Sequence, residues 1–85
     1  HEAVVYLGVR EYYQHQGIGQ ALINRIEAWA LNHHIRRIEA TVVTENINAI
    51  ELFKGMGFQI EGELKDKLFI NQKYYNEYVM AKILN

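Results

Sequence analysis

The order of apolar and polar residues along the chain predicts strands at both ends and helices between them. Residues 3–9 (AVVYLGV) are rich in β-branched and aromatic side chains and are apolar on both faces, which is typical of a central strand covered on both sides. An apolar period of three and four residues then predicts a helix from Gly17 to about His33, with Arg25 and Glu27 off its apolar stripe. The predicted buried stripe consists of Ile18, Leu22, Ile26 and Trp29.

A second strand and a second helix follow. Residues 37–43 (RIEATVV) alternate in polarity and are β-branched, which predicts a strand. Residues 49–56 (AIELFKGM) predict a short helix, because Asn46 or Asn48 can cap its start and Gly57 can end it. The apolar positions expected to bury this helix are Ala49, Ile50, Phe53 and Met56.

The last third of the chain predicts an antiparallel hairpin. Residues 58–69 and 75–84 are long strand-like runs joined by the polar stretch INQKY. The predicted order is therefore β-α-β-α-β-β, and a right-handed strand-helix-strand unit makes the first two strands parallel. We expect an α/β protein with a mixed sheet (α+β), in which residues 1–85 form a single domain.

Composition narrows the function classes. A formal net charge of −1 provides no basic surface for nucleic acid, and the longest apolar run is too short to cross a bilayer. The sequence has no cysteine, which excludes disulfides, a thiolate nucleophile and a cysteine zinc site, and fits a cytoplasmic protein. The adjacent His33 and His34 point about 100° apart on a helix, so we expect no metal site.

The stretch QHQGIGQALI, residues 14–23, is the main candidate for binding chemistry. A strand, a glycine-bearing loop and a helix start together make an anion site, because the first helical N–H groups are unpaired. The stretch lacks the lysine and hydroxyl of a nucleoside-triphosphate loop, and Leu22 stands where a dinucleotide fingerprint needs glycine or alanine. Two interpretations of Gly17 and Gly19 stay open, namely a tight turn alone or a turn that binds a phosphate.

Three segments in order resemble the GNAT superfamily of N-acetyltransferases. LGVREYYQHQGIGQALI resembles the acyl-CoA-binding motif, with Gln14, Gly17 and Gly19 at its defining positions. TVVTENINAIELFKGMGF is similar to the family's next strand and helix, and IEGELKDKLFINQKYYNEYVMAKIL to its closing hairpin. The matching residues of the second segment are Asn46, Ala49, Gly57 and Phe58. The resemblance implies that residues 1–85 are the C-terminal, acetyl-CoA-binding half of a GNAT fold whose N-terminal half is absent.

The resemblance implies acetyl-CoA as cosubstrate. The backbone of Leu7, Gly8 and Val9 is expected to hydrogen-bond the pantetheine arm where two parallel strands splay apart. The amides of the following loop are expected to bind the pyrophosphate, and Asn46 is expected to contact the pantetheine or help order the site. The loop residues concerned are Gln14, His15, Gln16, Gly17, Ile18, Gly19 and Gln20. His15 is either a further phosphate contact or an ordinary loop histidine.

The family reaction is direct attack of a neutral amine on the thioester, without a protein nucleophile. The usual general acid is a tyrosine, at the position that Phe53 occupies here beside the cofactor. Water or another tyrosine could protonate the leaving thiolate instead. Glu2, Glu11 and Glu45 are candidate bases by their positions near strand ends, and surface carboxylates by the alternative interpretation.

We expect an N-acetyltransferase that acts on a primary amine of a protein, peptide or small molecule. The alternative is a non-catalytic CoA-binding or self-association module derived from the same fold. In relatives the closing hairpin borders the acceptor pocket, so Tyr74 and Tyr75 could touch substrate, although simple hairpin packing explains them as well. The strand Ala3 to Val9 has an unpaired edge, which predicts a homo-oligomer or pairing with a missing N-terminal segment.

Overall fold

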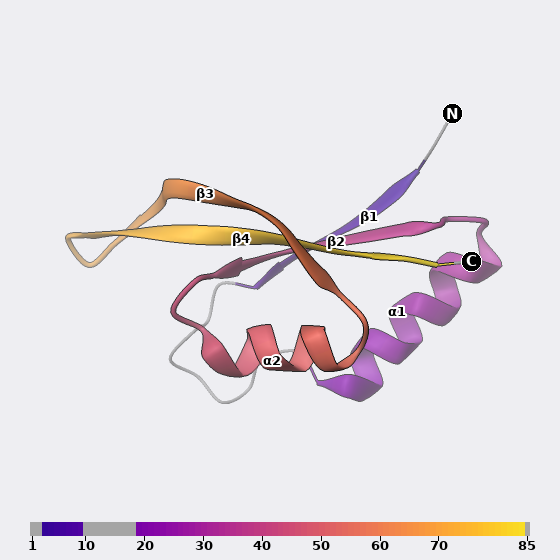
Figure 1. Cartoon of the computed structure of the whole chain (residues 1–85). Coiled ribbons are helices and arrows are strands. Elements are labelled where there is room, and N and C mark those ends of the chain that lie inside the picture. Colours follow the sequence, from indigo (N-terminus) through magenta and orange to yellow (C-terminus); the bar gives the residue numbers. More distant parts are fainter. Residues whose placement is uncertain (1–2, 10–18, 85) are drawn as a thin grey trace.

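The computed structural model describes residues 3–9 and 19–84, which form one four-stranded sheet and two helices (Figure 1). The elements in chain order are β1 (Val4–Val9), α1 (Gln20–Asn32), β2 (Arg37–Val43), α2 (Ile47–Gly55), β3 (Gln59–Ile70) and β4 (Lys73–Ile83). This order confirms the predicted β-α-β-α-β-β pattern.

The strands lie in the order β1-β2-β4-β3. β1 runs parallel to β2, with Val4 opposite Arg37 and Val9 opposite Val42, while β4 is antiparallel to both β2 and β3. The predicted mixed sheet is therefore confirmed.

β1 is an edge strand within the described part of the chain, and the prediction of a central strand covered on both sides is wrong there. Only Val9 of this strand is buried, and the Tyr6 side chain is 71% exposed. Val5, Leu7 and Val9 contact the core on one face of β1, whereas the described residues leave Tyr6 on the other face exposed. The edge of this strand is unpaired within the described residues, as predicted.

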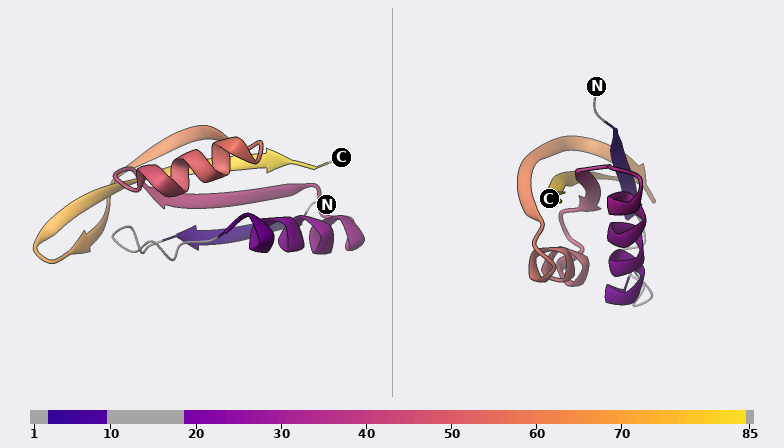
Figure 2. Two further views of the ribbon diagram at one scale, coloured as in Figure 1. Left: turned by 90° about the horizontal axis from the view of Figure 1, so that it is seen from below. Right: turned by 90° about the vertical axis from the view of Figure 1, so that its right-hand side faces the viewer.

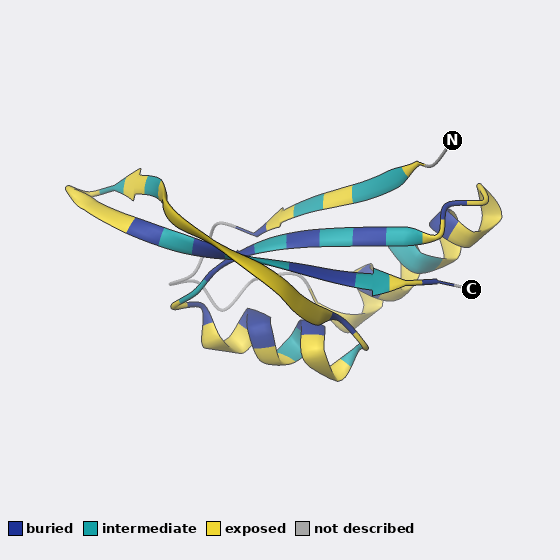
Figure 3. Cartoon of the chain, turned by 45° about the horizontal axis from the view of Figure 1, so that its top comes forward, coloured by how far each residue is buried: buried dark blue, intermediate teal, exposed yellow. Residues whose placement is uncertain are grey.

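Both helices pack on the same face of the sheet, as the two views of Figure 2 show. The alternate residues Ile38, Ala40 and Val42 of β2 point to this face and are fully buried. Figure 3 shows that burial is concentrated on the two inner strands, β2 and β4. The core cluster contains Val9, Ile23, Ala30, Ile35, Ile38, Ala40, Val42, Ala49, Ile50, Phe53, Phe58, Met80 and Leu84.

α1 buries a different side from the one predicted, and it begins at Gln20, three residues later than predicted. Ile23 and Ala30 are fully buried, while Leu22 and Trp29 are 45% and 51% exposed. Trp29 therefore is not a core residue. Instead, its ring stacks on His33 at a centroid distance of 4.2 Å.

The sheet-facing side of α1 also includes a charged residue that was expected off the stripe. The Glu27 carboxylate accepts a hydrogen bond from Lys82 of β4 at 3.0 Å, and its side chain is only 16% exposed. The ion pair lets Glu27 lie on the inner side of the helix, because the partner charge compensates for lost solvent.

α2 begins and ends as its sequence predicts. Of the two candidate caps, Asn46 is the one used, since its Oδ1 accepts a hydrogen bond from Ala49 N at 3.2 Å. Beyond the helix Gly57 has φ +95°, and Phe58 N donates to Phe53 O at 2.9 Å. With the bond from Gly57 N to Lys54 O, this is a Schellman motif, which requires the left-handed backbone that glycine adopts without strain.

The end of α1 follows the same plan without a glycine. Ile35 N donates to Ala30 O at 2.8 Å and His34 N to Leu31 O at 3.1 Å. His34 thereby occupies the left-handed position with φ 59°. A side chain with a Cβ costs free energy in this conformation, so the bend into β2 is strained at His34.

The hairpin of β3 and β4 is longer, and its turn shorter, than predicted. Ile70 pairs with Lys73, so only Asn71 and Gln72 form the turn, and both have positive φ (51° and 67°). This is the backbone of a type I′ turn, which matches the twist of the strands. Two register shifts, one of them between Leu64 and Leu68, interrupt the ladder. Figure 1 shows the hairpin tip extending past the start of α2.

Candidate functional site

The starts of α1 and α2 follow the carboxyl ends of the parallel strands β1 and β2. β1 ends at Val9 and β2 at Val43, and α2 starts four residues beyond β2, at Ile47. In sheets of this kind the carboxyl ends of parallel strands are the usual place for a ligand, because the connecting loops diverge there. We therefore take this end of the sheet as the candidate site.

The first turn of α1 is open to an anion. Its N-cap is Gly19, no side chain caps it, and the first turn contains no acidic residue. A Cβ built on Gly19 would meet no atom within 4 Å, so the space beside the cap is free in the described part of the chain. Helix amides without a side-chain acceptor bind phosphate groups well, because the helix dipole adds positive potential.

The first turn of α2 is closed. Asn46 is 6% exposed, and its side-chain oxygen already accepts the hydrogen bond from Ala49 N. A backbone bond from Thr44 N to Asn76 O, 3.0 Å long, joins the turn after β2 to the hairpin. The two helix starts therefore differ among the described residues: a side chain, that of Asn46, caps α2, and no side chain caps α1.

An ion pair lies at the rim of this end of the sheet. Lys73 Nζ is 3.2 Å from Glu45 Oε2, and both side chains are about half exposed. The same Lys73 ammonium lies 4.9 Å from the ring centroid of Tyr75. The Glu45 carboxylate is thus already paired with a cation.

Glu77 of β4 is a buried carboxylate at the same end. It is directly opposite Val43, the last residue of β2, and its exposed fraction is 1%. Its Oε2 atom is buried and has no hydrogen-bond partner in the structure. Burial of an unpaired carboxylate oxygen is costly, which makes Glu77 the most unusual polar group among the described residues.

The described residues provide no metal site and no membrane span. No group of three or more His, Asp or Glu side chains in this part of the chain could hold a metal ion. Neither of the helices described is both long and apolar enough to cross a bilayer.

A family model described as an acetyltransferase (GNAT) domain matches residues 1–79. The chain belongs to the GNAT acetyltransferase family. It is 33% identical over 72 residues to L-amino acid N-acetyltransferase AaaT of Escherichia coli (strain K12), a match that covers 84% of this chain and 44% of AaaT.

Solved GNAT structures share the fold. Arabidopsis thaliana NAA60, in complex with a bisubstrate analogue, superposes with a TM-score of 0.81 at 31% identity, over 99% of this chain and 51% of that one. Spermidine/spermine N-acetyltransferase SpeG from Vibrio cholerae gives 0.74 at 29% identity, over 87% and 44%. The chain thus spans about half the length, or less, of these relatives.

The GNAT motif residues fall into two groups in the structure. Gly19 and Gln20 lie at the open start of α1, and both are exposed. Gln14, His15, Gln16, Gly17 and Ile18 lie outside the described residues, as do the candidate bases Glu2 and Glu11. Their roles stay predictions.

The expected pantetheine segment of this GNAT chain is part of a regular ladder. Leu7 is half-buried, Gly8 is exposed and Val9 is buried. Pairing with β2 is continuous as far as Val9, so the expected splay between the two parallel strands does not occur between Val4 and Val9. The prediction that Leu7, Gly8 and Val9 bind the pantetheine arm is not tested by this geometry.

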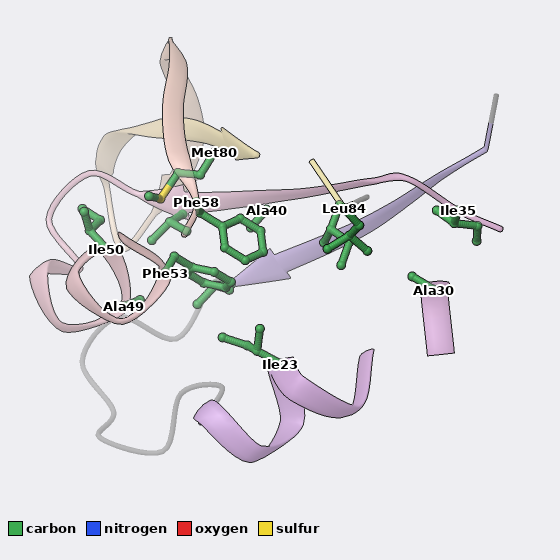
Figure 4. Packing of buried hydrophobic residues seen from close by; sticks show 13 residues of the cluster. Ile23, Ala30, Ile35, Ala40, Ala49, Ile50, Phe53, Phe58, Met80 and Leu84 are labelled. Atoms are coloured by element: carbon green, nitrogen blue, oxygen red, sulfur yellow. The ribbon is translucent and has the colours of Figure 1, made fainter. Parts of the chain in front are cut away.

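Phe53, which the sequence resemblance assigns to the position of the GNAT general acid, is fully buried in α2. Its ring contacts that of Phe58 edge to face at a centroid distance of 4.9 Å (Figure 4). This contact stabilises the Schellman motif that ends the helix, because the two residues flank it. The described role of Phe53 is thus in packing, and its predicted place beside the cofactor stays a prediction.

The hairpin tyrosines differ from each other. Tyr75 is 7% exposed, whereas Tyr74 is 59% exposed and packs against Phe69 at a ring distance of 4.7 Å. Both tyrosines were expected as possible substrate contacts, whereas Glu77, two residues after Tyr75, was not. A signal existed, since Glu77 is the one charged residue in the alternate set Tyr75, Glu77, Val79, Ala81 and Ile83 of β4.

Proposed function

We propose that this chain binds acetyl-CoA and serves as the cofactor-binding part of an enzyme that transfers the acetyl group to a primary amine. The observation that carries the proposal is the uncapped start of α1 at Gly19, next to the carboxyl ends of two parallel strands. A pyrophosphate is a dianionic ligand of the kind that such helix starts bind.

The relatives support an amine as acceptor. AaaT is named for L-amino acids and SpeG for spermidine and spermine, and both names specify N-acetylation. An amino group is the chemical feature that these acceptors share. The acceptor of the present chain is therefore proposed as a primary amine of a small molecule, peptide or protein.

The chemistry needs no acid at Phe53. A neutral amine attacks the thioester carbonyl, and CoA leaves as a thiolate whose free pKa is about 8.5. Such a leaving group departs near neutral pH with water as proton donor. Because Phe53 has no hydroxyl, solvent protonation of the thiolate is the route we propose.

Calorimetry with acetyl-CoA tests the binding step, and a matched pair of variants tests where it occurs. Gly19→Asp places a carboxylate over the first-turn amides, whereas Gly19→Asn caps the same amides without charge. We expect the affinity of Gly19→Asp for acetyl-CoA to be at least tenfold below that of Gly19→Asn, while both variants melt at or above the wild-type temperature. Equal affinities would show that the pyrophosphate binds elsewhere.

A non-catalytic CoA-binding or self-association module is the second candidate, favoured by the missing hydroxyl at Phe53 and the unpaired edge of β1 within the described residues. Thiol release from acetyl-CoA with an L-amino acid and with spermidine separates the two. Release that depends on the amine supports the enzyme. Binding without release supports the module.

The edge of β1 is also a proposed contact surface, for a second copy or for an N-terminal segment of the fold. An unpaired parallel-sheet edge exposes backbone N–H and C=O groups that another strand can pair with. Size-exclusion chromatography with light scattering checks this, and a monomer at micromolar concentration contradicts self-pairing.

A further inference from the structure

Glu77 has a buried carboxylate, and no described residue donates a hydrogen bond to one of its two oxygens. Its exposed fraction is 1%, and Oε2 has no partner in the structure. A buried oxygen of this kind has lost its hydrogen bonds to water and has formed none to the protein in their place. A side chain kept at such a cost is a candidate for binding something that the chain itself does not supply.

Three cations of the described sheet are paired with other carboxylates. Lys73 pairs with Glu45 at 3.2 Å, and Lys82 pairs with Glu27 at 3.0 Å. Arg37 donates to both Glu39 and Glu61. Among residues 3–9 and 19–84 no ion pair includes Glu77, so Oε2 can accept a donor from outside these residues.

The position of Glu77 suits a second substrate. It lies opposite Val43, so it is level with the carboxyl end of β2 and with the start of α2 at Asn46. Its side chain shares a sheet face with Val43, whereas Val42 faces the helices. The two helices cover only that other face (Figure 2), so the proposed cofactor and an acceptor can approach from opposite sides.

The hairpin gives a route to the carboxylate. Leu64 of β3 is directly opposite Glu77, and directly opposite residues share a face. Leu64 is 38% exposed and stands at the register shift where regular pairing stops until Leu68. A side chain at a break in the ladder can turn aside with less loss of packing than one in a continuous ladder.

We propose that Glu77 Oε2 receives the ammonium group of the acceptor, an inference that rests on the proposed acetyl transfer. The carboxylate takes one proton from the ammonium and later passes it to water. The neutral amine forms the N–C bond to the thioester carbonyl carbon as the C–S bond breaks, and the thiolate takes the remaining amine proton directly or through water. The products are the amide and CoA.

NMR of the chain labelled with ¹³C at glutamate carboxyl carbons tests this inference, with n-butylamine as the probe and CoA present. The Glu77 signal is identified by its absence in Glu77→Gln. We expect it to shift on titration with the amine, and we expect Glu77→Gln to lose at least tenfold in amine affinity. Glu51→Gln is the matched control, because Glu51 is an exposed carboxylate on α2 that should leave the affinity unchanged.

The results separate the two proposals. If the Glu77 signal does not move, or if Glu77→Gln binds the amine as wild type does, the assignment of Glu77 is overturned. Calorimetry on the same samples measures CoA binding, which should be within twofold of wild type in Glu77→Gln. Absence of CoA binding in wild type overturns the proposed function instead. Leu64→Ala, which shortens the covering side chain, should strengthen amine binding if the route is correct.

Discussion

Replacing Glu77 by methionine should make the protein more stable. Methionine is unbranched and similar in size to glutamate, so it can fill the same space without a polar atom. The structure shows one buried oxygen without a partner, and such an atom costs about 1–3 kcal/mol of folding free energy. For a domain of this size each kcal/mol corresponds to roughly 4–8 °C in melting temperature. We therefore expect Glu77→Met to melt several degrees above wild type.

Circular dichroism during heating and urea denaturation measure this effect independently. Glu51→Met is the control, because an exposed substitution should change the stability by no more than about 0.5 kcal/mol. A lower melting temperature for Glu77→Met than for wild type would refute the reasoning, since it would mean that the carboxylate is held by favourable bonds. Higher stability together with lost amine binding is the pattern of a residue kept for function at a cost in stability.

Two further predictions concern the ends of the elements. His34→Gly should raise the free energy of unfolding by about 0.5–1 kcal/mol, because glycine removes the left-handed backbone strain at φ 59°. Gly57→Ala should lower the free energy of unfolding, because alanine is strained at φ +95°. Urea denaturation measures both variants, and a His34→Gly protein less stable than wild type would contradict the strain at His34. Arg37 donates to Glu61 at 2.5 Å and lowers the pKa of that carboxyl below its usual value of 4.5. A lowered folded pKa gives stability above the unfolded pKa that is lost as the pH falls through the folded one, so the difference between wild type and Glu61→Gln should be full at pH 7 and decrease as the pH falls below 4.5. A difference that stays constant in urea denaturation as the pH is lowered until the carboxyl is protonated would show that the ion pair is not its source.

Local signals predicted the elements and the end of α2 well. Gly57 and Phe58 could be predicted because the Schellman motif depends on residues adjacent in sequence, a left-handed glycine followed by an apolar residue. The Asn-containing turn of the hairpin was located within two residues for the same reason. The sequence could not decide between Asn46 and Asn48 as the N-cap, because both side chains can accept the capping hydrogen bond. The structure shows that Asn46 is the cap.

The buried side of α1 could not be predicted from periodicity alone. Its sequence QALINRIEAWALN contains apolar residues around most of the helix, so two apolar stripes are possible. One contains Leu22 and Trp29, the other contains Ile23 and Ala30, and Ile26 belongs to both. The sheet selects the stripe with Ile23 and Ala30, which both belong to the core cluster. Trp29 then lies at the edge of an open groove of about 360 Å³ beside β1. Packing against the sheet determines which of the two stripes is buried, and the helix sequence alone does not contain this information.

The candidate site was predicted in part for a similar reason. The glycine of the α1 cap is adjacent in sequence to its helix. The environment of Glu77, in contrast, depends on its pairing with Val43 and Leu64, which are 34 and 13 residues away in sequence. A charged residue at a position where the strand pattern is otherwise apolar is a signal that the residue is unusual. This signal does not predict which residues of other strands surround it. The structure supplies those neighbours, and with them the burial that distinguishes Glu77 from Glu45, whose carboxylate is exposed and paired.

The acid expected at position 53 and the base proposed at Glu77 concern two different proton transfers of the reaction, the first to the leaving thiolate and the second from the acceptor ammonium. A thiolate leaves near neutral pH without an acid, because its conjugate thiol has a pKa of about 8.5. A primary ammonium has a pKa near 10.4, so at neutral pH almost all of the acceptor is protonated and unreactive. The loss of a base therefore slows the reaction far more than the loss of an acid. If Glu77 is the base that we propose, a chain with phenylalanine at position 53 retains the group that acetyl transfer needs more.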